Sequence, residues 1–123
     1  MSIKRLPDSE LEVMQAVWEL GDRAPRAEVE RMIRENNGLA QTTILTLLSR
    51  LTEKGFIRAE KEGRSSVYTA LISRKDYLAS QSRRFFEKLC GGDISAFAAA
   101  LSGSGISRED LAELRDLLER KEL

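Results

Sequence analysis

Histidine is absent from this chain of 123 residues, and cysteine occurs once, at Cys90. These two shortages remove the most common general base, the most common metal ligands and any disulfide within the chain. The sequence therefore argues against an enzyme and against a metal or other cofactor. Cys90 lies near the expected end of a helix with apolar neighbours, which favours a packed thiol over a redox switch.

Long apolar runs are missing as well. No stretch is long enough to cross a bilayer, and residues 1–20 lack the basic start and apolar centre of a secretory signal. We therefore expect a cytoplasmic protein with no membrane insertion. The length allows one modest core, or one compact domain with an appendage whose apolar face needs a partner.

The chain also lacks an excess of either charge, because 20 Lys and Arg residues balance 20 Asp and Glu residues. The whole-chain charge therefore does not indicate a polyanionic partner. The distribution is uneven, since residues 39–75 contain seven basic and three acidic side chains. Such an excess fits either a nucleic-acid surface or an ordinary solvated face.

Three helices are expected in the first part of the chain. Cap-type residues precede the first apolar periodic segment and Pro25 precedes the second, and glycine or asparagine follows each of the three. The expected ranges are Asp8 or Ser9 to Leu20, Pro25 to about Asn36, and Gln41 to Lys54. The third helix has the clearest pattern, with Ile44, Leu47, Leu48 and Leu51 spaced to form one core face.

The opposite face of this third helix has an unusual composition. It carries short hydroxyl side chains and Arg50, and no carboxylate occurs before Glu53. A helix that only faces solvent is expected to carry Glu and Lys pairs there. Hydroxyl, amide and guanidinium groups match the hydrogen-bonding groups that base edges present in the major groove. Leu45 flanks this face, where it is either an ordinary exposed leucine or a contact for a thymine methyl group.

Two strands are expected to follow, at Phe56–Glu60 and Ser66–Leu71, because apolar and polar residues alternate in both. The connector Lys61–Ser65 is short enough for a hairpin. Three helices followed by a hairpin with a charged tip is the element order of a winged helix-turn-helix domain. The tip either contacts phosphates or is a solvated turn, and Glu62 weakens its positive charge. The candidate DNA-binding residues are Gln41, Thr42, Thr43, Thr46, Arg50, Lys61 and Arg64.

The remaining chain predicts three more helices. Ser73 and Asp76 resemble a capping box for a helix towards Gly91, a shorter helix carries Ile94 to Leu101, and Ser107 caps the last. Their apolar side chains exceed what these helices could shield alone, which indicates a dimer, although a monomeric cap on the winged domain is the alternative. The candidate dimerisation residues are Leu78, Phe85, Phe86, Leu89, Phe97, Leu101, Leu111, Leu114 and Leu118.

These elements predict a mostly α fold with a small β-hairpin. We expect a winged helix-turn-helix domain over residues 1–72 and a three-helix dimerisation region over residues 73–123. The predicted function is a sequence-specific repressor that binds a dyad-symmetric DNA operator as a homodimer. The alternative is a winged-helix module that binds protein, and salt dependence separates the two because only DNA binding releases many counterions.

Three segments together resemble the BlaI/MecI/CopY penicillinase repressor family: LPDSELEVMQAVWEL from Leu6, TTILTLLSRLTEKGFI from Thr42 and ISREDLAELRDLL from Ile106. The likeness covers nearly the whole chain. It implies a homodimeric repressor with an N-terminal winged helix, a C-terminal helical dimerisation region and an inverted-repeat operator that overlaps a promoter.

The chain departs from the family pattern in three places. Members that resemble the copper-responsive branch carry C-terminal cysteines, and this chain has none after Cys90. In the β-lactam-responsive branch a membrane sensor-protease triggers cleavage; the matching region here, with Ala99 and Ala100 as the candidate cut site, has little identity to the cut site of that branch. That branch tends to place basic residues where this chain has Thr42 and Leu45, which implies a changed base preference or weaker attraction to phosphates.

Overall fold

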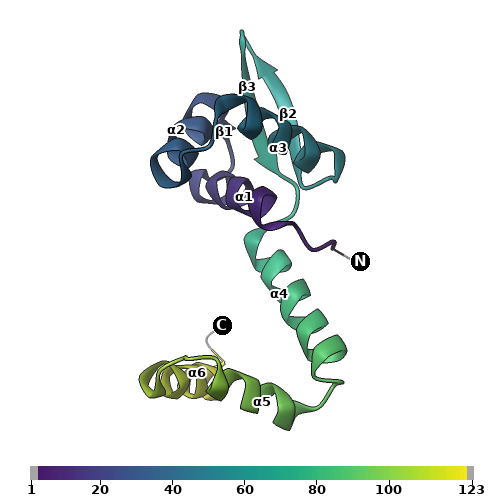
Figure 1. The fold of residues 1–123 in the computed structure, drawn as a ribbon, viewed down its shortest axis with the longest axis vertical. Helices are drawn as coiled ribbons and strands as arrows, with labels where there is room; N and C mark the ends of the chain where they lie inside the picture. The colour runs from purple at the N-terminus through teal and green to yellow at the C-terminus, as the bar shows by residue number, and fades with distance from the viewer. Residues whose placement is uncertain (1–2, 122–123) are drawn as a thin grey trace. The chain divides into compact units, whose positions relative to one another are not determined.

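The computed structural model describes residues 3–121 and divides the chain into two compact units between Gln81 and Ser82. Each unit is described by itself, and Figure 1 shows the elements of both. In chain order the elements are α1 (Asp8–Leu20), β1 (Ala24–Pro25), α2 (Arg26–Asn37), α3 (Gln41–Glu53), β2 (Ile57–Glu62), β3 (Ser65–Ala70), α4 (Arg74–Arg84), the π-helix η1 (Phe85–Leu89), α5 (Ile94–Gly103) and α6 (Arg108–Arg120). None of the helices within residues 3–121 is long and apolar enough to span a membrane.

The first unit has the predicted winged helix-turn-helix fold, with α1, α2 and α3 packed against a small sheet. The apolar stripe of α3 is buried, as its spacing indicated, and it shares a core with Val13, Met14 and Val17 of α1. Burying these side chains removes apolar surface from water, which stabilises the packing of α3 against α1. The exposed face of α3 is thereby turned away from the core.

The sheet is antiparallel with the strand order β1-β3-β2, so it has one more strand than the sequence predicted. In the additional strand, Ala24 pairs with Tyr68 and Pro25 with Val67. A strand of two residues is too short to show alternation, which is why the pattern missed it. Pro25 also precedes α2 as its N-cap residue instead of opening the helix.

The hairpin turn is tighter than the expected connector Lys61–Ser65. Strands β2 and β3 remain paired up to Glu62 and Ser65, which leaves Gly63 and Arg64 as the turn. Gly63 has a φ of 64°, a left-handed conformation that two-residue hairpin turns require. The side chains at the tip are exposed, so no apolar alternation marked these strand ends in the sequence.

The start of α4 belongs to the first unit, whereas the sequence placed the domain boundary near Ile72. The Tyr77 side chain is buried, and its hydroxyl oxygen accepts a hydrogen bond from the Leu6 backbone N–H at 2.9 Å. Its ring lies 5.6 Å from that of Trp18 and 5.8 Å from that of Phe56. The predicted Ser73 cap is present, since Ser73 Oγ accepts from the Asp76 N–H at 3.0 Å.

The second unit contains η1, α5 and α6. The expected continuous helix towards Gly91 is α-helical only to Arg84 and continues as a π-helix to Leu89. The predicted Ser107 cap is confirmed, because Ser107 Oγ accepts from the Asp110 N–H. The Phe97 ring lies 5.7 Å from the rings of Phe85 and Phe86. None of the described residues from Ser82 to Lys121 is fully buried, so this unit has no core of its own.

Candidate DNA-binding interface

The exposed face of α3 is the centre of the candidate interface. Gln41, Thr42, Thr43, Thr46 and Arg50 are all exposed, opposite the buried stripe of the same helix. Leu45 is half-buried at the edge of this face. The helix therefore presents hydroxyls, one amide and one guanidinium to solvent, and these groups suit the major groove.

The N-terminus of α3 leaves its first backbone N–H groups without a side-chain cap. Its N-cap residue is Ala40, and the first turn contains no acidic side chain. The N-terminus of a helix carries partial positive charge and unpaired N–H groups, both of which favour a phosphate. The first turn of α3 therefore contributes no negative charge that would repel a DNA backbone at this end.

Thr46 is constrained in a way that the sequence did not indicate. Its Oγ1 donates a hydrogen bond to the Thr42 backbone carbonyl at 3.0 Å, one helical turn earlier. With its proton used in this way, the Thr46 hydroxyl is left to accept a hydrogen bond, and the residue is exposed. In this rotamer Thr46 suits a base amino group or a thymine methyl group.

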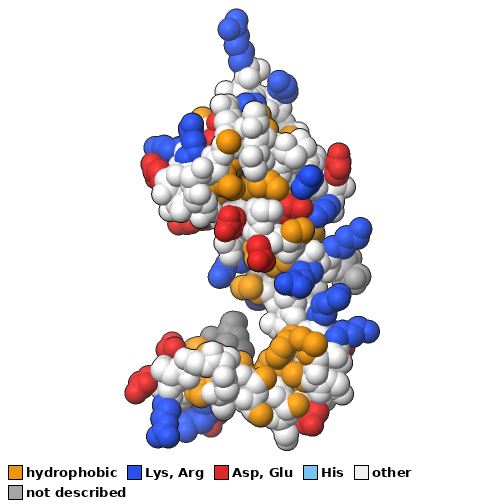
Figure 2. Space-filling view, in the orientation of Figure 1, with side chains coloured by type: hydrophobic (Ala, Val, Ile, Leu, Met, Phe, Trp, Pro, Cys, Tyr) orange, Lys and Arg blue, Asp and Glu red, His pale blue; other side chains and the backbone are white. Residues whose placement is uncertain are grey.

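The hairpin tip is more basic than its sequence suggested. Glu62, which we counted against Lys61 and Arg64, forms an ion pair with Arg23 from the turn before β1. Glu60 is paired with Arg58 at 2.8 Å. Within residues 3–121, Lys61 and Arg64 have no such partner, and Figure 2 shows Lys and Arg side chains extending where Figure 1 places the tip.

Arg23 is thus a contributor that sequence reasoning missed. Its partner lies on a different element, and no local spacing rule links residues so far apart in the chain. Because both side chains are largely exposed, the pair adds little stability. The consequence of this ion pair is electrostatic, because Arg23 balances the charge of Glu62, the one carboxylate between Lys61 and Arg64.

A small polar cluster lies where α2 meets the sheet. The buried Glu30 carboxylate accepts from Arg26 Nε at 2.9 Å, one turn earlier on α2. The pKa of the nearby Tyr68 phenol is raised above its ordinary value, mainly by burial. The positive charge of Arg26 opposes this shift, the negative charge of Glu30 adds to it, and a hydrogen bond with Ser66 opposes it. Because burial raises the pKa of this phenol above its ordinary value, Tyr68 stays neutral at physiological pH.

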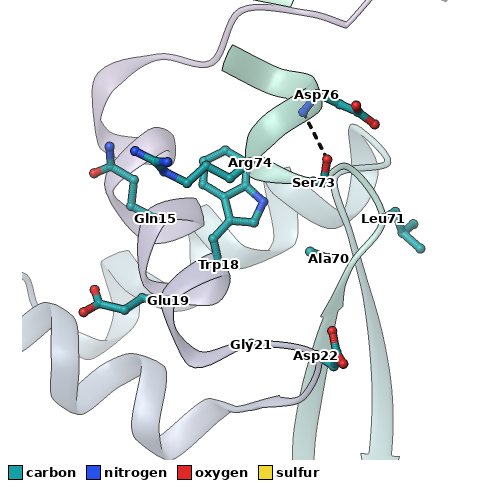
Figure 3. A pocket seen from close by; sticks show the side chains of 10 residues that line it. All are labelled: Gln15, Trp18, Glu19, Gly21, Asp22, Ala70, Leu71, Ser73, Arg74 and Asp76. Carbon is teal, nitrogen blue, oxygen red and sulfur yellow. Dashed lines mark hydrogen bonds between the residues drawn. The ribbon is translucent and has the colours of Figure 1, made fainter. Parts of the chain in front are cut away.

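A hollow of about 730 Å³ lies at the root of the hairpin, far from its tip. Figure 3 shows Trp18 at its centre, with residues from α1, the end of β3 and the start of α4 around it. The carboxylates of Glu19, Asp22 and Asp76 line it, with Arg74 as the single basic side chain among its lining residues. This charge repels phosphate, so the hollow is unsuited to DNA.

The candidate dimerisation residues are divided between the two units. Leu78 is exposed on α4 within the first unit, and the others lie in the second. Most of these are half-buried, whereas Leu89 is 78% and Leu118 is 54% exposed. Hydrophobic side chains gather on the visible face of the second unit in Figure 2. The candidate cut site, Ala99 and Ala100, lies inside α5.

Comparisons with known proteins agree with this geometry. A family model described as penicillinase repressor matches residues 6–120. The penicillinase repressor of Bacillus licheniformis is 32% identical over 118 residues, which cover 95% of this chain and 91% of the relative.

Two solved structures also match, each with 37% identity. The DNA-binding domain of the repressor BlaI has a TM-score of 0.55, with 63% of this chain and 94% of that one covered. The Bacillus licheniformis BlaI monomeric form in complex with the blaP half-operator has a TM-score of 0.53, with 62% and 92% covered. The chain belongs to the BlaI/MecI/CopY penicillinase repressor family, a family of transcriptional repressors and not of enzymes.

Proposed function

We propose that this protein is a sequence-specific DNA-binding repressor whose α3 helix reads base edges in the major groove. The observation that carries this proposal is the exposed face of α3, which holds hydroxyls, an amide and Arg50 directly opposite a buried stripe. A helix fits the major groove. The uncapped N-terminus of α3 suits a flanking phosphate, as do Lys61 and Arg64 at the hairpin tip, which have no ion-pair partner among the described residues. The BlaI structure with a half-operator supports the same use of this domain.

The protein acts as a homodimer in this proposal. The second unit has no buried side chain among its described residues, yet it exposes Leu89, Ile94 and Leu118. Small helical assemblies of this kind need a partner to remove their apolar faces from water. A twofold dimer places two α3 helices about 34 Å apart, or at a multiple of that distance, so the operator is expected to have dyad symmetry.

Selection of bound sequences from random double-stranded DNA, followed by footprinting of the selected consensus, tests this function. We expect a palindromic consensus with two protected half-sites. Recovery of unrelated sequences with no shared half-site would contradict sequence-specific recognition. Binding that does not weaken as salt rises would instead favour a winged-helix module that docks on protein.

Arg50→Ala is expected to weaken binding to the selected operator by about 1 to 3 kcal/mol, because a bidentate contact with a base is lost. Binding to unrelated DNA should change much less, since non-specific complexes depend mainly on phosphate contacts. Fluorescence titrations of operator and non-operator duplexes at one salt concentration measure both. An unchanged operator affinity would refute this role of Arg50.

Lys61→Ala is expected to weaken operator and non-operator binding alike, because a phosphate contact carries no sequence information. The slope of log affinity against log salt should fall in magnitude by about 1. Titrations at four or more salt concentrations measure this slope. The matched control is Lys75→Ala, since Lys75 is an exposed lysine on α4, away from the hairpin tip. Equal slopes for Lys61→Ala and the unchanged protein would remove Lys61 from the interface.

We further propose that cleavage within α5 releases the repressor, in response to a membrane sensor-protease. Ala99 is exposed, and a unit without a buried core opens locally at low cost in free energy, as cleavage of a helix requires. Incubation of the protein with the soluble protease domain of a cognate sensor should produce a cut near Ala99 and Ala100 and lose operator binding. An uncut chain with its operator still bound would contradict this part of the proposal.

A further inference from the structure

An ion pair between a buried carboxylate and a lysine whose side chain is 30% exposed joins α1 to the end of α3. Glu10 lies in the first turn of α1, and its side chain is only 4% exposed. Its Oε1 atom lies 2.5 Å from Nζ of Lys54, which is 44 residues further along the chain. The other buried carboxylate among residues 3–121 is Glu30, and its partner Arg26 lies on the same helix. Of these two ion pairs, only Glu10–Lys54 connects two different elements, α1 and the end of α3.

The surroundings of the pair stabilise both charges. Glu10 lies at the N-terminal end of α1, where the helix dipole favours a carboxylate, and Lys54 is the C-cap residue of α3, where it favours a cation. A carboxylate this deeply buried is costly unless a partner meets it in a defined geometry. Leucine and methionine contacts between α1 and α3 tolerate small shifts, whereas this pair requires one relative placement of the two helix ends.

The turn of α3 that this pair holds is the one that carries Arg50. The backbone N–H of Lys54 donates to the Arg50 carbonyl at 3.0 Å, which couples the two residues through one helical turn. Arg50 itself points to solvent and has no ion-pair partner within the described part of the chain. The position of its guanidinium group relative to the winged domain therefore depends on where the end of α3 is held.

We propose that Glu10 and Lys54 are positioning residues that set the placement of the last turns of α3 and thereby direct Arg50 to its base contact. This inference rests on the proposed function, because it assigns the two residues a role in operator preference that acts through Arg50. A pair that only stabilises the fold would change the folded fraction and leave the preference of the folded protein for its operator unaltered.

The experiment compares the full-length protein with Lys54→Met and Glu10→Gln on the selected operator and on an unrelated duplex of equal length. The readout is the ratio of the two dissociation constants, measured at a temperature where circular dichroism shows each variant folded. We expect this ratio to fall about tenfold in Lys54→Met, within the range of coupling energies between residues in contact. Glu10→Gln deprives only Lys54 of its partner, and the Lys54 side chain is 30% exposed, so this variant should stay folded and lower the ratio about threefold.

Two controls separate positioning from stability. Arg26→Met leaves the buried Glu30 carboxylate without its partner, so it should destabilise the same unit but keep the operator preference. Lys54→Arg keeps a cation beside Glu10 and should retain most of the preference. In addition, Arg50→Ala should cost little further operator affinity in the Lys54→Met background, because a displaced Arg50 has already lost its contact.

The outcomes are distinguishable. In one outcome, the wild-type protein shows an operator preference that Lys54→Met and Glu10→Gln both retain in full. That result would overturn the inference and leave the proposed function standing. The inference would also be overturned if Arg50→Ala lowered operator affinity equally in the wild-type and Lys54→Met backgrounds, because independent residues contribute additively. If the wild-type protein showed no preference for its operator over the unrelated duplex, the proposed function and this inference would both be overturned.

Discussion

Replacing Leu118 by aspartate is expected to turn the protein into a monomer and to weaken operator binding by about 100-fold or more. Leu118 is 54% exposed in the single chain, so the charge meets solvent there and the monomer tolerates it. In a dimer the same carboxylate is buried against apolar side chains without a partner, which is costly. Once the dimer is lost, each winged domain binds alone and the gain from two linked contacts disappears.

Analytical ultracentrifugation and an operator titration measure the two effects of Leu118→Asp together. Leu71→Asp is a matched control, because Leu71 is 51% exposed and directly follows β3 in the first unit. It should leave both the mass and the affinity unchanged. Leu89→Asp provides a second probe of the proposed surface, since Leu89 is 78% exposed. A dimer that persists in both second-unit variants would refute the proposed dimerisation surface.

Tyr77→Ala is expected to lower the free energy of unfolding of the first unit by about 3 to 5 kcal/mol, the cost of removing a buried aromatic side chain. Tyr77 packs between the rings of Trp18 and Phe56, and it ties α4 to the segment before α1 through Leu6. A loss of this size is a large fraction of the stability of a small domain. The winged domain of such a variant should be largely unfolded at moderate denaturant concentration.

Urea unfolding followed by circular dichroism measures this change. The variant Tyr77→Phe separates the contribution of the ring to stability from that of the hydroxyl group. The phenylalanine variant keeps the packing but leaves the buried Leu6 N–H unsatisfied, at an expected cost of about 1 to 3 kcal/mol. Lys75→Ala, at an exposed position on the same helix, should change the stability by less than about 0.5 kcal/mol. If Tyr77→Ala were as stable as this control, α4 would not belong to the winged domain.

The elements that show a clear period were predictable. The i, i+3, i+4, i+7 spacing of apolar residues in α3 indicated both the helix and its exposed face, and the Ser73 and Ser107 caps are local hydrogen bonds between near neighbours. The family resemblance agreed with these patterns and is confirmed. Strand β1 and the two-residue turn at Gly63 escaped prediction because neither contains enough residues to show alternation.

The sequence by itself determined the winged-helix order of the first unit, the family and the chemistry of the exposed α3 face. Local spacing and turn residues specify these, and each acts over a few neighbouring positions. Only the tertiary structure decided that Tyr77 extends the winged domain into α4, that Arg23 neutralises Glu62 at the hairpin tip, and that Lys54 is held by Glu10. In each case the partners lie far apart in the chain, and no local pattern encodes which residues meet after the core has formed.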